Sequence, residues 1–74
     1  MKKSEVARAL RAAPDAGPHP FLAGYTLEVS RHRGRYRVYP YYILRDVSGV
    51  TRFTNTDADT LADVFVRMYA QWEA

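Results

Sequence analysis

The hydrophobic period of this chain changes once, and that change limits the folds it can adopt. Between Tyr25 and Phe53 apolar residues alternate with polar ones, which is the spacing of strands with one buried face. Near the end of the chain the apolar residues recur every three or four positions, as they do along the buried stripe of an amphipathic helix: Leu61, Val64, Phe65, Met68, Tyr69 and Trp72. The sequence therefore predicts an α+β domain in which a C-terminal helix covers one face of an antiparallel sheet.

The Arg33-Gly34 dipeptide marks a predicted hairpin between the first two strands. Interpreted as a two-residue loop, it places Val29 opposite Val38, and directly opposed residues share a sheet face. A second turn is predicted at residues 46–49, because a type I turn favours Asp at its first position and Gly at its fourth. Both turns assign the same residues to the buried face: Leu27, Val29, Tyr36, Val38, Tyr42, Leu44 and Phe53.

The middle strand of the predicted sheet contains a proline. With the second turn in place, Tyr42 lies opposite Phe53 in the predicted register. Pro40 interrupts this scheme, since a proline cannot donate a hydrogen bond to a neighbouring strand. A bulge at Pro40 would exchange the faces of Tyr41 and Tyr42.

The chain is predicted to begin and end with helices. Ser4 is placed to cap a short helix over about residues 5–13, which Pro14 ends. The Pro-rich residues that follow are expected to form a stiff loop without regular structure. The last helix is predicted to begin with a capping box formed by Thr56 and Asp59.

These elements assemble into one predicted domain over residues 1–74. An N-terminal helical arm with its Pro-rich loop occupies residues 1–20, and a body of sheet plus helix occupies residues 21–74. The expected order is α-β-β-β-α: a short N-terminal helix, a three-stranded antiparallel β-meander and a C-terminal amphipathic helix packed on one face of the sheet. A chain of 74 residues has only a small apolar core, which leaves little material for a deep cleft.

Two absences from the sequence limit where the protein is expected to act. The chain has no cysteine, which excludes disulfides and thiolate metal sites and favours a reducing compartment. No apolar stretch approaches the roughly 20 residues that a membrane-spanning helix needs. We therefore expect a cytoplasmic protein with no membrane partner.

The positive charge is concentrated in the centre of the chain. Residues 31–52 carry six arginines against one aspartate, a net charge of +5 in a chain whose total is +3. Arginines neutralise phosphates and tyrosine rings stack on bases, so the predicted open face of the sheet is expected to bind nucleic acid. The predicted contact residues are Arg31, Arg33, Arg35, Arg37, Tyr39, Tyr41, Arg45 and Arg52.

An open face of arginine and tyrosine is also typical of a surface that a protein covers. The alternative function is therefore a protein-binding inhibitor or adaptor, of the kind that phages and mobile elements encode. An anti-CRISPR type of inhibitor, acting on a nucleic-acid-handling complex, is one example. Self-association into a homodimer through the same face is a further possibility.

The sequence does not predict an enzyme. His19 and His32 lie in different predicted elements and have no companion ligands at metal-binding spacing. Asp57, Asp59 and Asp63 fall at the start of the last helix, where capping and surface pairing explain them. We therefore expect no catalytic residues, no metal, no cofactor and no small-molecule substrate.

The predicted sheet resembles two known nucleic-acid-binding architectures. Three antiparallel strands followed by a helix are similar to the arm-type DNA-binding domains of tyrosine recombinases, over Tyr25 to Trp72, with Arg35-Tyr36-Arg37 before a turn and residues 51–54 leading into the helix. This resemblance implies that the sheet contacts the major groove of DNA. The α-β-β-β-α order also resembles double-stranded RNA-binding domains, although Asp57 and Asp59 replace their basic helix start.

Overall fold

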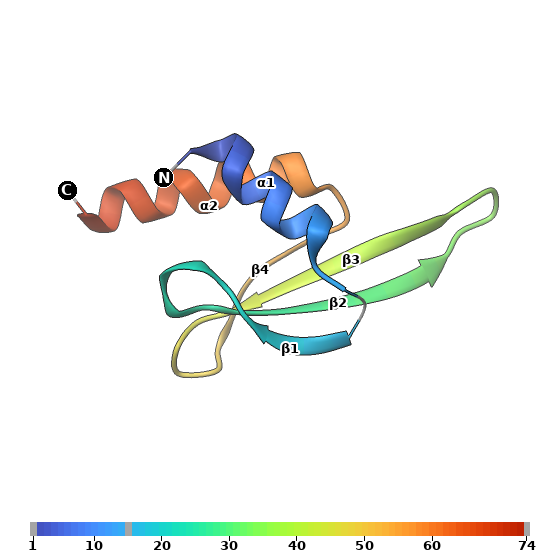
Figure 1. Ribbon diagram of the computed structural model, residues 1–74, viewed down its shortest axis with the longest axis horizontal. Helices are drawn as coiled ribbons and strands as arrows, with labels where there is room; N and C mark the ends of the chain where they lie inside the picture. The colour runs from blue at the N-terminus through green and yellow to red at the C-terminus, as the bar shows by residue number, and fades with distance from the viewer. Residues whose placement is uncertain (1, 15, 74) are drawn as a thin grey trace.

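The computed structural model describes residues 2–14 and 16–73, in which two helices pack on one face of a four-stranded antiparallel sheet (Figure 1). The elements are α1 (Lys3–Ala12), β1 (Ala16–Pro20), the 3₁₀ turn η1 (Leu22–Gly24), β2 (Thr26–Arg33), β3 (Val38–Arg45), β4 (Thr51–Asn55) and α2 (Ala58–Glu73). The strands lie in the order β1-β2-β3-β4. The predicted α+β class is confirmed, and the predicted number of three strands is wrong.

The additional strand is the Pro-rich segment that the sequence predicts to be a loop. β1 lies at the edge of the sheet, where a proline does not interrupt a ladder on both sides, and Pro20 pairs with Thr26 of β2. Gly17 lets the two strands approach closely. A Cβ atom at Gly17 would lie 2.9 Å from the backbone oxygen of Leu27 and 2.9 Å from the Cα of Glu28.

The hairpin between β2 and β3 has a longer loop than the sequence predicts. The Gly34 N–H donates to the Arg37 carbonyl at 2.8 Å, so the loop spans residues 34–37. Val29 consequently lies opposite Tyr42 instead of Val38, a shift of four residues. Side chains alternate with a period of two, so an even shift keeps the predicted faces of β2 and β3.

The shift nevertheless moves two predicted core residues out of the core. Tyr36 lies in the loop and is 91% exposed, and Val38 is 52% exposed. The other five residues of the predicted buried face are buried or half-buried: Leu27, Val29, Tyr42, Leu44 and Phe53. On β4 the register is also shifted, since Phe53 pairs with Leu44 and an irregularity follows at Arg45.

Pro40 does not cause a bulge between β2 and β3. It lies opposite Arg31 in an unbroken register, and Tyr42 is buried while Tyr41 lies on the other face, as predicted without a bulge. In an antiparallel pair of strands, residue pairs that exchange backbone hydrogen bonds alternate with pairs that do not. Gly34 and Arg37 are a bonded pair, so Arg31 and Pro40, three positions further along each strand, are a non-bonded pair. The proline nitrogen therefore faces away from β2, and β4 does not reach this part of β3.

α2 begins with a different cap from the predicted one. The Asp57 carboxylate accepts hydrogen bonds from the Asp59 N–H at 3.2 Å and from the Thr60 hydroxyl at 2.6 Å. The Thr60 hydroxyl bond is the main reason that the pKa of Asp57 lies below its ordinary value. Thr56 makes no such contact among the described hydrogen bonds. Because α2 begins at Ala58, Asp57 occupies the cap position and Thr56 lies one residue before it.

The buried stripe of α2 is rotated relative to the predicted one. Its buried residues are Ala58, Leu61, Ala62 and Phe65, and Val64 and Met68 are half-buried. The predicted continuation of the stripe through the side chains of Tyr69 and Trp72 lies outside the described part of the chain. Within the described residues, no helix has both the length and the apolar character needed to cross a membrane.

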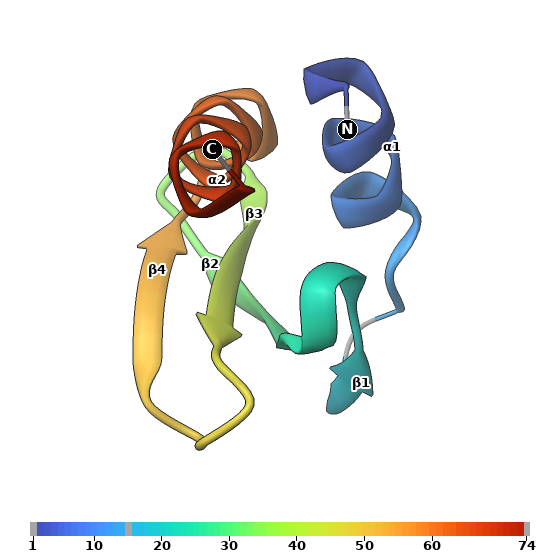
Figure 2. The ribbon, with the colours of Figure 1, turned by 90° about the vertical axis from the view of Figure 1, so that its left-hand side faces the viewer.

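α1 packs beside α2 and completes the core (Figure 2). Val6 and Leu10 have no exposed area and belong to the same buried cluster as Phe65. The cap position is Lys2, without a side-chain bond, so the predicted Ser4 cap is wrong and Ser4 lies inside the helix. Arg11 of α1 pairs with Asp59 of α2 at 2.6 Å across the exposed side of the contact.

Truncation of Leu10 tests whether α1 is an integral part of the fold. We expect Leu10→Ala to lower the free energy of unfolding by about 2–5 kcal/mol, because a fully buried leucine leaves a cavity. The matched control is Leu22→Ala, whose side chain is 37% exposed and should cost about 1 kcal/mol. Urea unfolding followed by circular dichroism measures both values. Equal losses for the two variants would contradict the docking of α1.

Candidate nucleic-acid interface

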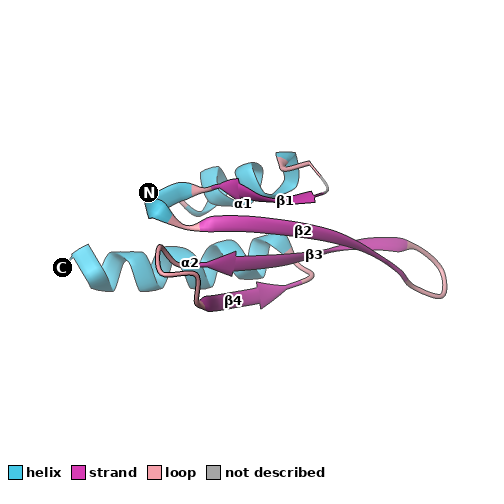
Figure 3. Cartoon of the chain, turned by 90° about the horizontal axis from the view of Figure 1, so that it is seen from below, coloured by secondary structure: helices cyan, strands magenta, loops and turns pink. Residues whose placement is uncertain are grey.

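β2 and β3 extend beyond the helices as a two-stranded projection, which we call the ribbon (residues 30–41). Figures 1 and 3 show it running past the ends of α1 and α2. The last cross-strand pair with both side chains buried is Val29 and Tyr42. Gly34, where the loop begins, is five positions beyond Val29, which corresponds to a projection of about 17 Å at the usual rise of a strand.

The ribbon carries positive charge only. Four arginines lie on it, Arg31, Arg33, Arg35 and Arg37, and the sequence has no Asp or Glu between Glu28 and Asp46. Arg35 and Arg37 occupy the terminal loop, while Arg31 and Arg33 lie on β2 on the side that faces the helices. Among the described residues, no carboxylate forms an ion pair with Arg33, Arg35 or Arg37.

Tyr39 and Tyr41, on the β3 strand of the ribbon, lie on the other side from Arg31 and Arg33. Tyr39 stacks on His32 with ring centroids 5.9 Å apart, and Tyr41 meets the same imidazole edge-on at 5.5 Å. Ser30 lies 3.2 Å from the His32 ring nitrogen and continues this row. Arginine and tyrosine therefore do not form the single stripe that the sequence predicts, because the loop takes Arg35 and Arg37 out of the strand.

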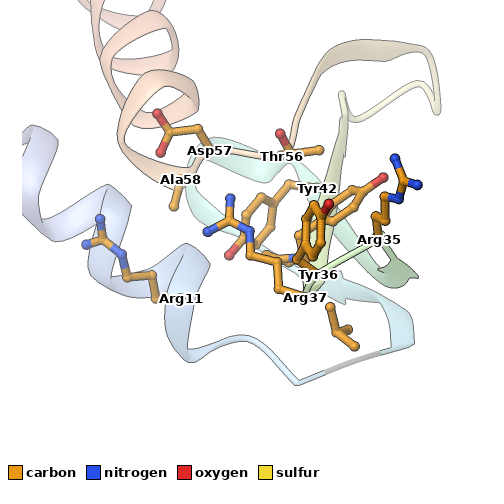
Figure 4. Close-up of a pocket in the computed structure, with 12 residues that line it drawn as sticks. Arg11, Arg35, Tyr36, Arg37, Tyr42, Thr56, Asp57 and Ala58 are labelled. Atoms are coloured by element: carbon orange, nitrogen blue, oxygen red, sulfur yellow. The ribbon is translucent and has the colours of Figure 1, made fainter.

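A groove of about 1000 Å³ lies in the corner between the ribbon and the ends of the helices (Figure 4). Val38 and Pro40 of the ribbon line it together with the neighbouring Tyr42, and Arg11 and Asp57 line it on the side of the helices. In Figure 4 the Arg37 side chain extends toward the helices, whereas Arg35 points away from them. The groove thus combines cationic and aromatic side chains with the single carboxylate of the α2 cap.

The remaining two predicted contact residues lie at the opposite end of the sheet. Arg45 ends β3 and lies 3.7 Å from Glu28, and the Arg52 Nε donates to Asp46 at 2.7 Å. Arg45 is eight positions from Arg37, which precedes β3, and eight positions of extended strand span about 26 Å. The structure therefore groups six of the eight predicted residues on the ribbon and places Arg45 and Arg52 in ion pairs away from it.

Asp46 organises the turn from which Arg52 departs. One carboxylate oxygen accepts hydrogen bonds from the Ser48 N–H, the Ser48 hydroxyl and the Val50 N–H, at 2.9, 2.6 and 3.0 Å. The Ser48 hydroxyl and then Arg52 hold the pKa of Asp46 well below its ordinary value of 3.8. Arg52 thus stabilises this turn through its bond to Asp46, and this structural role is sufficient to explain an arginine at position 52.

The Asp46 turn predicts a specific acid sensitivity. A carboxylate whose folded pKa is lowered stabilises the fold above its unfolded pKa, and this contribution is lost as the pH falls below about 4. We expect Asp46→Asn to reduce the acid-dependent loss of unfolding free energy, because asparagine does not titrate. Ser48→Ala and Arg52→Gln should each remove part of the effect. Urea unfolding measured across the acid range tests this, and an unchanged pH slope in Asp46→Asn would contradict it.

The sequence missed Arg11 and the groove, since both depend on α1 docking beside α2. Within the described residues, no group of three His, Cys, Asp or Glu side chains is placed to hold a metal ion. Comparison of the chain with protein-family models, curated proteins and solved structures gives no match. The resemblances to recombinase arm domains and to double-stranded RNA-binding domains therefore rest on the predicted element order alone, to which the structure adds the strand β1.

Proposed function

We propose that this protein is a non-enzymatic DNA-binding domain that inserts the ribbon into a groove of the duplex. The observation that carries the proposal is the projecting pair of strands with four arginines and no carboxylate. A positively charged ribbon that lies inside a groove of the duplex has a phosphate backbone on each side of it. A flat sheet face would contact the duplex on one surface only.

The dimensions of the ribbon support duplex DNA as the ligand. The major groove of B-DNA is about 12 Å wide and about 8.5 Å deep, and it admits a two-stranded β-ribbon. The projection of about 17 Å exceeds that depth. The major groove of duplex RNA is too narrow for a ribbon, so we expect DNA to bind more tightly than RNA of the same sequence.

The residues of the ribbon divide into two roles under this proposal. Tyr36 enters the DNA groove first, and its 91% exposure leaves its ring available to base edges. Arg33, Arg35 and Arg37 are placed to reach the phosphates on the two sides of the DNA groove. Asp57 lies across the corner groove from the ribbon, so the phosphates are expected to lie against the ribbon.

The salt dependence of DNA binding tests these roles. If Arg33, Arg35 and Arg37 each neutralise one phosphate, the slope of log K against log salt concentration is about −2.7. We expect the double variant Arg35→Gln/Arg37→Gln to reduce the slope to about −0.9. The matched control is Arg45→Gln/Arg52→Gln, which removes two arginines that are already paired and should keep the slope. Fluorescence anisotropy with a labelled duplex measures both, after circular dichroism has verified the folds.

Two results would contradict the DNA-binding proposal. One is the absence of duplex binding at about 50 mM salt, where electrostatic binding is strong. The other is an equal loss of slope in the ribbon variant and in the control variant. If the wild-type chain instead recovers a stoichiometric acidic protein after nuclease treatment, the ribbon belongs to the alternative function of a protein-binding inhibitor or adaptor.

A further inference from the structure

The sheet face opposite the helices, which we call the outer face, is not covered by any described element (Figures 2 and 3). Its central side chain is Ile43, which lies between Glu28 on β2 and Thr54 on β4. Tyr41 and Tyr39 continue it along β3 onto the ribbon. These apolar and aromatic side chains have the composition of an interface core.

The charges of the outer face are balanced, in contrast to those of the ribbon loop. Glu28 and Arg45 lie 3.7 Å apart on this face, and the nearest further charges, Asp46 and Arg52, also form a pair. A face without excess charge has no electrostatic attraction for a polyanion. One acid and one base side by side are complementary to the same pair on a second copy related by a two-fold axis.

We infer that the outer face packs against the outer face of a second copy of this chain, giving a two-fold dimer. Two sheets packed face to face bury their inner side chains between layers about 10 Å apart. Glu28 of each copy then lies near Arg45 of the other. The inference does not use the arginines of the ribbon, and it goes beyond the proposed DNA binding.

The contact in this dimer is centred on Ile43, in the body of the sheet. The ribbon, on which the proposed DNA binding depends, extends beyond this body (Figure 3). The helix-side residues of the ribbon, Arg31 and Arg33, remain on the outside of the dimer.

The sheet edges are poorly suited to association, which leaves the outer face as the route to a dimer. β1 carries Pro18 and Pro20, and a proline cannot complete a ladder with a new strand. β4 has five residues and an irregular register beside Arg45. Short, bulged or proline-bearing edges are the common devices that prevent strand addition.

Solution mass and a charge exchange test the dimer. Sedimentation equilibrium of the wild-type chain should give twice the 8.5 kDa mass of one copy. Ile43→Lys should give the monomer mass, with circular dichroism and thermal unfolding as evidence that it folds. Glu28→Arg should raise the dimer dissociation constant at least about tenfold, because the introduced arginine of each copy then faces Arg45 of the other. The double exchange Glu28→Arg/Arg45→Glu should restore dimerisation, and Arg35→Gln/Arg37→Gln should remain dimeric.

Each other outcome overturns the inference. A wild-type chain that is monomeric at millimolar concentration has no such interface. A dimer that persists in Ile43→Lys and in Glu28→Arg uses a different surface, and a failure of the double exchange to restore dimerisation removes the charge complementarity. A monomer that binds DNA with the expected slope would refute the dimer and leave the DNA-binding proposal intact, whereas a dimer without DNA binding would do the reverse.

Discussion

The packing of Phe65 against three aromatic rings holds the two layers of this protein together. Its ring meets Tyr25 at 5.1 Å, Phe21 at 5.9 Å and Phe53 at 6.0 Å, each nearly edge-on. Phe21 and Tyr25 flank the η1 turn between β1 and β2, and Phe53 lies on β4, so one helical side chain ties α2 to distant parts of the chain. Burial also raises the pKa of Tyr25, since the ionised phenolate would lose its hydration there.

The ribbon exists because this packing stops before the strands do. Beyond Val29 and Tyr42 neither of the two described helices covers β2 and β3, and here the strands pair with each other and make the ring contacts of His32. Apolar residues are not required there, so arginines are tolerated at little cost in burial. The division between a buried body and a charged projection is thus a consequence of where the helices end.

Much of the fold could be predicted because it depends on local period. The faces of Leu27, Val29, Tyr42 and Leu44 are as predicted even though the loop at Gly34 has four residues, since an even error leaves the alternation intact. β1 could not be predicted, because its prolines are typical of loops and only the partner strand makes them an edge. Six candidate site residues lie together since they are neighbours in sequence. Arg45 and Arg52 lie away from the ribbon, in ion pairs with Glu28 on β2 and with Asp46 in the turn, because the folded sheet brings these partners together.

The sequence by itself determined the class of fold, the concentration of arginines between Arg31 and Arg37 and the faces of the central strands. Each of these follows from the order of residues over short distances, where side-chain alternation and helical spacing decide which atoms are neighbours. Only the tertiary structure decided that the segment after Pro14 is a strand, that α1 joins the core and that the basic segment projects. Those outcomes depend on contacts between residues far apart in the chain, and no local pattern specifies where one element ends against another.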